Sequence, residues 1–181
     1  MRLHTGDLLF VVNENGNAIT QSTVSAGQAP IDHVAIFFMR SGKPFVVEAT
    51  TGRGVSERGV NDFLGDNAVC LVGNVKGLDS KASVDKALAY VGLPYDSLFE
   101  PDDSAMYCSE LVQKCYVDKR GKAVFHTIPM SFHDASGTIV PYWIELYRRH
   151  GRSVPEGAPG TNPAQLAADK SVTIVGKIRS E

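Results

Sequence analysis

The sequence has few cysteines and no long apolar run, and both shortages exclude whole classes of protein. Its three cysteines cannot all pair with one another, and none has the C-x-x-C spacing of a zinc or redox motif: Cys70, Cys108 and Cys115. We therefore expect no disulfide framework and at least one free thiol. No run of about eighteen apolar residues occurs, so we expect no membrane-spanning helix.

The chain also lacks an excess of charge of either sign. It has 18 lysines and arginines against 20 aspartates and glutamates, which gives a net charge of -2 and a pI near 6.2. Without a basic stripe there is no surface for counterion release, so we expect no nucleic-acid partner. The N-terminus enters a strand-like pattern without a basic segment and an apolar run, so the given chain predicts no signal peptide.

What the sequence does have is enough apolar residues for a sizeable core. With 181 residues, of which 43% are hydrophobic and 21% charged, it predicts a single domain over 1–181. The apolar periodicity predicts strands over 7–12, 34–39, 45–49, 69–72 and 172–178. It predicts helices over 80–91, 108–116 and 141–147. A long irregular loop is expected over 151–169.

The strands 34–39 and 45–49 are close enough to form a hairpin. With Ser41-Gly42 as a two-residue turn, Arg40 opposes Lys43. Counting back along the pair places His33 and Glu48 on one face as diagonal neighbours, roughly 7–8 Å apart at the backbone. Glu48 is then a candidate to orient the imidazole, and a one-residue slip would move it to the other face. The alternative is a strand-end carboxylate that reaches solvent.

Cys108 begins an amphipathic pattern, where the N-terminal end of a helix favours an anion. An ordinary cysteine thiol, with a pKa of about 8.5, is only a few per cent thiolate at neutral pH. Lowering such a pKa to about 5 takes roughly 5 kcal/mol, and a helix terminus supplies at most about 2 kcal/mol. A catalytic Cys108 therefore needs a nearby imidazolium. The alternative is a small buried side chain on the apolar face of the helix.

The other cysteines and histidines are given structural roles. Cys115 lies two turns further along the apolar face and Cys70 lies inside an apolar strand, so both are expected in the core. The remaining histidines do not pair at metal-ligand spacing, so we expect no metal: His4, His126, His133 and His150. The glycines near Gly73 and Gly77 form no phosphate-binding pattern, and no cofactor is expected.

Several phrases, taken in order, resemble one known family. They are Thr5-Gly6-Asp7-Leu8-Leu9-Phe10, Asp32-His33-Val34-Ala35-Ile36, Val47-Glu48-Ala49, Gly92-Leu93-Pro94-Tyr95-Asp96 and Tyr107-Cys108-Ser109-Glu110-Leu111-Val112. With the histidine before the cysteine, the chain resembles the circularly permuted branch of the NlpC-type papain-like cysteine peptidases, the YiiX-like group. The resemblance continues through 129–132 and 155–163, so it covers nearly the whole chain.

This resemblance implies an α+β, papain-like fold, in which an antiparallel sheet carrying the histidine packs against the helix that begins at the cysteine. Carried over by position, Cys108 is the nucleophile, His33 the general base and Glu48 the residue that orients the ring. The backbone N–H of Cys108 would contribute to an oxyanion hole. Tyr107 is a candidate for the wall of the substrate pocket or for a further donor.

The chemistry that the resemblance implies is hydrolysis or transfer of an amide or acyl ester through a thioacyl intermediate. The leading hypothesis is a thiol amidase or peptidase acting on small amide-containing substrates such as cell-wall peptides. The second is an acyltransferase or hydrolase acting on an acyl-lipid substrate, which predicts an apolar groove beside Cys108 walled by Met106, Phe99 and Phe132. The third is a non-catalytic binding module, which the presence of thiol, imidazole and carboxylate disfavours.

Two further expectations concern surroundings. By analogy with envelope-associated relatives, we expect the protein in the bacterial cell envelope. The turn-rich composition of the loop 151–169 is typical of segments that border a functional cleft.

Overall fold

The protein, described here from a computed structural model over residues 2–24 and 29–180, has an α+β fold built on one antiparallel sheet. Six strands lie in the order β4-β3-β2-β1-β5-β8, and every neighbouring pair is antiparallel. In chain order they are β1 (Leu8–Val12), β2 (Ile31–Arg40), β3 (Lys43–Thr50), β4 (Gly54–Gly59), β5 (Val69–Val75) and β8 (Val172–Arg179). A separate pair joins β6 (Ile128–Pro129) to β7 (Pro159–Gly160).

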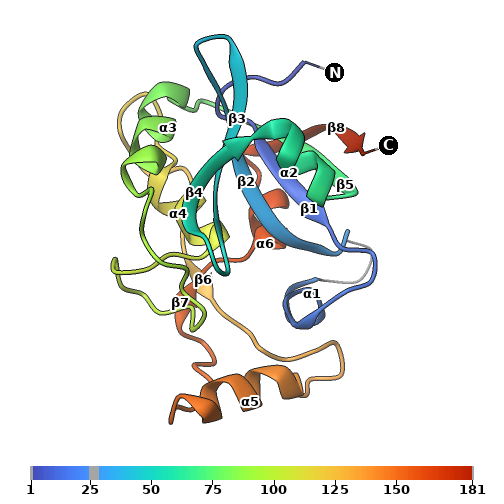
Figure 1. Ribbon diagram of the computed structural model, residues 1–181. Helices are drawn as coiled ribbons and strands as arrows, with labels where there is room; N and C mark the ends of the chain where they lie inside the picture. Colours follow the sequence, from blue (N-terminus) through green and yellow to red (C-terminus); the bar gives the residue numbers. More distant parts are fainter. Residues whose placement is uncertain (1, 25–28, 181) are drawn as a thin grey trace.

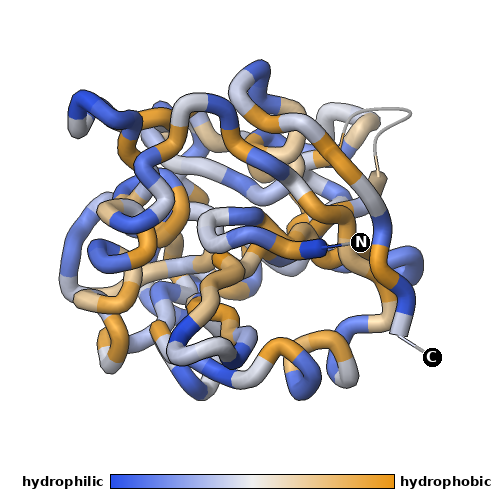
Figure 2. The backbone as a smooth tube through the Cα atoms, turned by 90° about the horizontal axis from the view of Figure 1, so that it is seen from above, coloured by the Kyte–Doolittle hydropathy of each residue, from blue (hydrophilic) through white to orange (hydrophobic). Residues whose placement is uncertain are grey.

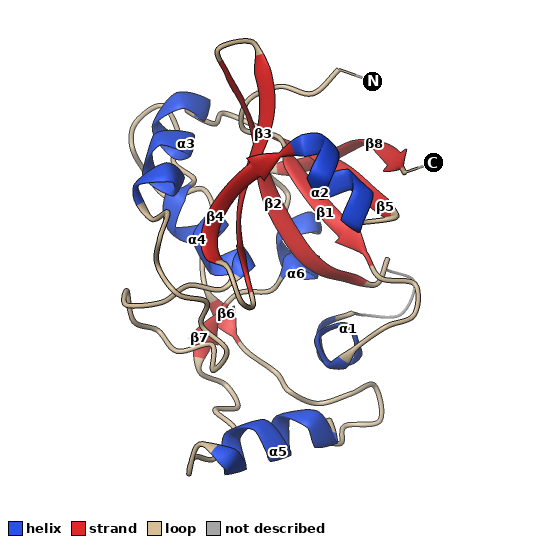
Figure 3. Ribbon diagram, in the orientation of Figure 1, coloured by secondary structure: helices blue, strands red, loops and turns tan. Residues whose placement is uncertain are grey.

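Helices cover both faces of the sheet (Figures 1 and 3). The helix α2 (Val60–Asp66) packs on one face, and α3 (Ser80–Ala89), α4 (Cys108–Cys115) and α6 (Pro163–Ala167) pack on the other. Two more helices, α1 (Ala18–Thr23) and α5 (Pro141–Arg149), lie beyond the end of the sheet. Among the described residues, no helix combines the length and the apolar character needed to cross a bilayer.

The two sheet faces have separate cores because side chains alternate along each strand. Leu8, Phe10 and Ile36 are buried against α3, α4 and α6, whereas Leu9 and Ala35 are buried on the α2 side. Strands buried on both faces are apolar throughout instead of alternating, as β1 and the middle of β2 are. Figure 2 shows the backbone coloured by hydropathy, with hydrophobic segments alternating with hydrophilic ones along the chain.

The helix α5 is attached through a third, mostly aromatic cluster. Trp143 packs edge-on against Phe132 with ring centroids 5.4 Å apart, and its indole N–H donates to the Ser22 hydroxyl at 2.7 Å. The Tyr147 hydroxyl donates to the Leu98 carbonyl at 2.6 Å. These contacts fix α5 against α1 and the loop before Cys108, which is the end of the sheet that carries the candidate site.

The predicted α+β fold and the predicted hairpin register are confirmed. Arg40 pairs with Lys43 and Ile36 with Val47, as the two-residue turn requires. Ser41 and Gly42 both have positive φ, 51° and 76°, which matches the twist of the flanking strands. Each predicted strand and helix is present, with small differences at its ends.

Four elements outside the loop 151–169 were not predicted, and the prediction that this loop is irregular is wrong. The helices α1 and α2 and the strands β4 and β6 are absent from the predictions because all four are short and only weakly periodic. The segment 151–169 is not irregular throughout, since it contains β7 and α6. Asn162 caps α6 by accepting the Gln165 N–H at 2.7 Å, and Pro163 occupies the first turn.

The turn before β4 yields a stability prediction. Gly52 and Gly54 both have positive φ, but only at Gly54 would a Cβ atom overlap the Leu93 carbonyl oxygen, whereas nothing lies within 4 Å at Gly52. Gly52→Ala should cost about 1 kcal/mol of unfolding free energy, for the left-handed backbone alone. Gly54→Ala should cost at least about 2 kcal/mol more, because backbone must move. Urea unfolding of both variants checks this, and equal costs would contradict the described packing of β4.

Candidate functional site

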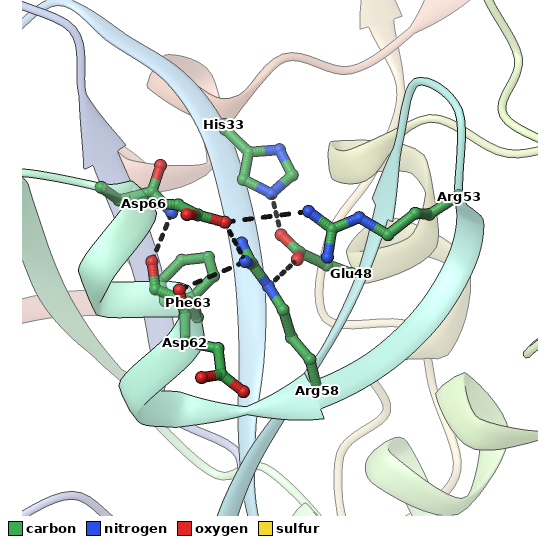
Figure 4. A network of polar contacts seen from close by, with 8 residues as sticks. His33, Glu48, Arg53, Arg58, Asp62, Phe63 and Asp66 are labelled. Atoms are coloured by element: carbon green, nitrogen blue, oxygen red, sulfur yellow. Dashed lines mark hydrogen bonds and ion pairs between the residues drawn. The ribbon is translucent and has the colours of Figure 1, made fainter.

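Three predicted side chains from three separate elements meet at one end of the sheet. His33 lies on β2, Glu48 lies on β3, and Cys108 is the first residue of α4. His33 Nε2 and Glu48 Oε2 are 2.6 Å apart (Figure 4). Glu48 is almost fully buried, with 1% of its side chain exposed, and the His33 side chain is 19% exposed. The Cys108 thiol is near enough to the His33 ring to raise the pKa of the imidazole.

The backbone explains how His33 reaches both partners. The hairpin register puts His33 and Glu48 on the α2 side of the sheet, whereas α4 packs on the other side. The pairing of β1 with β2 shifts at this point, because Val11 pairs with His33 but Val12 pairs with Ile31. Such a bulge bends the strand and redirects the side chains beside it.

Cys108 lies at the positive end of α4. The preceding residue, Tyr107, has extended backbone and provides no side-chain cap, so N–H groups of the first turn are available to an anion. Cys108 is buried but still lines a cavity. The other thiols are in the core as predicted: burial raises the pKa of Cys70 to about 11, with a contribution from the Glu48 charge, and that of Cys115 to about 12.

The pKa shifts of His33 and Glu48 indicate that these two side chains form an ion pair. Burial by itself would lower the pKa of His33, but hydrogen bonds to Cys108 and Glu48, together with their charges, raise it to about 10. Burial would raise the pKa of Glu48, yet the hydrogen bond and charge of His33 and the nearby Arg58 guanidinium lower it overall. A buried carboxylate is thus kept ionised by two cations.

Arg58 is a residue of this site that the sequence analysis missed. Its Nε donates to Glu48 Oε1 at 2.7 Å, so each carboxylate oxygen of Glu48 has its own partner. Arg58 lies on β4, where Ser56 opposes Glu48 and Arg58 opposes Val46. The sequence signal that could have revealed Arg58 was the segment 54–59, which follows a glycine-rich turn and forms β4. A third antiparallel strand there puts every second residue on the Glu48 face.

An apolar cavity with about 510 Å³ of empty space, counting its mouth, opens beside Cys108. Of the predicted wall residues, Tyr107, Phe99 and Phe132 line it. Met106 does not: its side chain is fully buried in the core on the α4 side of the sheet. The reason is that Met106 lies in an extended segment whose N–H bonds to the Pro94 carbonyl at 3.0 Å, which fixes it beneath the helix start.

The segment 159–163 contributes to this cavity, as expected for a bordering loop. Thr161, Asn162 and Pro163 line it. The Thr161 N–H donates to the Tyr107 hydroxyl at 3.1 Å, and the Thr161 hydroxyl donates to the Ser109 hydroxyl at 3.0 Å. These bonds attach the segment to the first turn of α4 on both sides of Cys108.

The contacts of Glu48 predict a pH-dependent loss of stability in the variant Glu48→Gln. At pH 7 the variant should lose about 1–3 kcal/mol of unfolding free energy, because the charge-assisted bonds to His33 and Arg58 are weakened. The folded-state pKa of Glu48 is lowered, so its contribution is present above the ordinary value of 4.5 and lost as pH falls below it. Urea unfolding of both proteins between pH 7 and pH 3 should therefore show a narrowing difference, and a constant difference contradicts it.

Comparisons with known proteins agree with this fold. The chain is 26% identical over 179 residues to the uncharacterized protein YiiX of Escherichia coli K12, covering 96% of this chain and 86% of the relative. A crystal structure of YiiX from Escherichia coli O157:H7, described there as a metalloprotein, matches with a TM-score of 0.81 and 24% identity over 99% of this chain and all of that one. Within the described part of this chain, no three His, Cys, Asp or Glu side chains are grouped to hold a metal ion.

A family model places the protein. Residues 2–176 match the model described as permuted papain-like amidase enzyme, YaeF/YiiX, C92 family. The match covers nearly the whole chain, including all three residues of the candidate site. The chain therefore belongs to the permuted papain-like amidases of the YaeF/YiiX family.

Proposed function

We propose that this protein is a cysteine hydrolase that cleaves an amide bond with Cys108 as nucleophile, His33 as general acid and base, and Glu48 as the residue that orients His33. The observation that carries the proposal is the contact between His33 and the buried Glu48, with Cys108, the first residue of α4, near enough to raise the pKa of His33. Membership of a family of papain-like amidases supports the reaction class. The NlpC-type relationship, the single domain and the envelope location stay predictions.

The hydrogen bonds of His33 define which nitrogen does which task. Glu48 occupies Nε2, which leaves Nδ1 as the nitrogen available to the Cys108 thiol. An ionised Glu48 keeps the proton on Nε2 and holds the ring in this orientation. The imidazolium then supplies the stabilisation of a thiolate that the helix terminus lacks, since the terminus gives at most about 2 kcal/mol of the roughly 5 kcal/mol needed.

The reaction then proceeds in two balanced halves. The Cys108 thiolate attacks the amide carbonyl carbon, a C–S bond forms, and the negative charge on oxygen faces the backbone N–H groups at the start of α4. The C–N bond breaks as His33 gives its Nδ1 proton to the leaving nitrogen, which leaves a thioester and a neutral imidazole. Water then gives a proton to His33 and attacks the thioester, and the C–S bond breaks to release a carboxylic acid and the thiolate.

A second candidate function uses the same residues on an acyl-lipid substrate. The cavity beside Cys108 favours it, because its lining includes seven large aromatic or aliphatic side chains: Ile19, Tyr95, Phe99, Tyr107, Met130, Phe132 and Trp143. Asp32 is the charged side chain in that lining. An apolar acyl group would bury its surface there. By family resemblance, however, cell-wall peptides remain the leading substrate class. A non-catalytic module would not need an ionised carboxylate buried behind a histidine.

The proposed nucleophile predicts selective alkylation of one thiol. At mildly acidic pH, iodoacetamide should modify Cys108 at least about a hundredfold faster than Cys70 or Cys115, because the proposed His33 imidazolium activates Cys108, whereas burial raises the pKa of the other two thiols. Peptide mapping by mass spectrometry measures the three rates. His33→Gln should slow Cys108 to the rate of the other two. Equal slow rates in the native protein would contradict a catalytic Cys108.

The substrate class is tested by a screen that compares acyl-lipids with muropeptides, with Cys108→Ala as the inactive control. If an apolar acyl group occupies the aromatic cavity, Phe132→Ala should lower kcat/KM for an acyl-lipid by about tenfold or more and change kcat/KM for a muropeptide less. Tyr142→Ala is the matched control, because Tyr142 is an exposed aromatic of α5 outside this cavity. Turnover of muropeptides alone would reject the lipid-directed function.

A further inference from the structure

Glu48 has a second partner that the proposed chemistry does not use. His33 takes Oε2 at 2.6 Å, and Arg58 Nε takes Oε1 at 2.7 Å, so the carboxylate is held from both sides (Figure 4). The Arg58 side chain is itself only 12% exposed, behind a Glu48 that is 1% exposed. A guanidinium this deep in the protein is fixed in place instead of sampling solvent.

Arg58 is in turn held by the helix α2. Its Nη1 donates to Asp66 Oδ2 at 2.5 Å and to the Asp62 carbonyl at 3.3 Å. Its guanidinium lies over the Phe63 ring, 5.1 Å from the centroid, and the His33 ring lies against the same phenyl at 6.4 Å. Three residues of one helix therefore fix the side chain whose Nε binds Glu48.

We propose that Arg58 is a positioning residue for the amide hydrolysis proposed above: it fixes the Glu48 carboxylate and keeps it ionised at the stage when His33 has given up its proton. The inference rests on the proposed function, since it concerns the same Cys108 and His33. It assigns Arg58 no contact with substrate. Asp66 acts one step further out, by orienting the guanidinium.

The charge changes of the cycle make this role necessary. In the resting state, Glu48 faces two cations, the imidazolium and the guanidinium. Once His33 has protonated the leaving nitrogen, the imidazolium charge is gone and a buried carboxylate faces a neutral ring. Arginine stays charged throughout, so Glu48 remains an acceptor and the ring keeps its orientation for the water step. Without Arg58, burial would favour a protonated Glu48 at that point.

Distances and exposure indicate which of the contacts around Arg58 can influence Glu48. Arg53 lies 3.8 Å from Asp66, with side chains 55% and 63% exposed, so solvent screens that pair and it should contribute little. The Arg58–Asp66 contact is shorter, and its Arg58 side chain is only 12% exposed. The groups that act on Glu48 directly are His33 of β2 and Arg58 of β4, with Cys70 of β5 near enough to feel its charge and Asp66 of α2 behind Arg58. The hollow that Glu48 lines is also lined by three further charged side chains, Glu14, Asp32 and Arg53.

The test is the pH profile of Cys108 alkylation, followed by peptide mapping. Removing a cation from beside Glu48 raises the pKa of that carboxyl, so Glu48 becomes protonated at a higher pH and its support of the ion pair ends there. In Arg58→Gln the acid limb of the profile should therefore move to higher pH by about 1 pH unit or more. Arg58→Lys keeps the charge but not the two-sided geometry, so it should shift the limb less.

Matched controls separate this role from a structural one. Arg40, at the end of β2, is a cation that pairs with Glu57 and not with Glu48. The alkylation profile of Arg40→Gln should therefore coincide with that of the native protein. On α2, Asp66→Asn should shift the limb in the same direction, whereas Asp62→Asn should not, because Arg58 binds the Asp62 main chain. This pair decides the question if Arg58→Gln does not fold.

The outcomes distinguish failure of the inference from failure of the proposed function. A native protein in which Cys108 is not selectively alkylated overturns the proposed function itself. Selective alkylation with superimposable profiles for native protein and Arg58→Gln overturns the role of Arg58 alone. So does a variant that loses unfolding free energy but keeps the native profile, because that result assigns Arg58 a structural role only.

Discussion

The hydrogen bond between His33 and the buried Glu48 carboxylate is the contact on which the candidate site depends. It exists because the two-residue turn of the β2–β3 hairpin sets one register, and the pleat then puts both side chains on one face. The His33 imidazolium and the Arg58 guanidinium keep the buried Glu48 carboxylate ionised. Glu48 and Cys108 in turn raise the pKa of His33 and keep its ring charged. No member of this set is stable in its ionised form when buried by itself.

The fold assembles the set from segments far apart in the chain. The helix α4 approaches from one face of the sheet, the Arg58 network lies on the other, and the bulge in β2 brings His33 within reach of both. The helix terminus contributes to activation of the Cys108 thiol, but it supplies the smaller part of the free energy needed to stabilise a thiolate. The larger part must come from the His33 imidazolium. The aromatic cavity and the Thr161 contacts then define where a substrate can approach Cys108.

Local rules were enough to predict the hairpin and the contact that it produces, because turn geometry and side-chain alternation act over a few residues. They were not enough for β4, whose Val55 N–H bonds to the Leu93 carbonyl at 2.8 Å, a partner far along the chain. Arg58 was missed together with that strand. Met106 was predicted to wall the groove beside Cys108 together with Phe99 and Phe132, but adjacent residues in an extended segment point to opposite sides, and Tyr107 rather than Met106 lines the cavity. The α6 cap at Asn162 was hidden in a turn-rich segment.

The central claim is that Cys108 and Glu48 together hold His33 as an imidazolium, and the most direct measurement is an NMR titration of its ring carbon and nitrogen shifts. We predict that the pKa of His33 lies at about 10, far above the ordinary value of 6.5, because Cys108 and Glu48 stabilise the imidazolium. We also predict that the value falls in Cys108→Ala and in Glu48→Gln, since each variant removes one of the groups that raise it. A native His33 that titrates near 6.5, unchanged in both variants, would contradict the account.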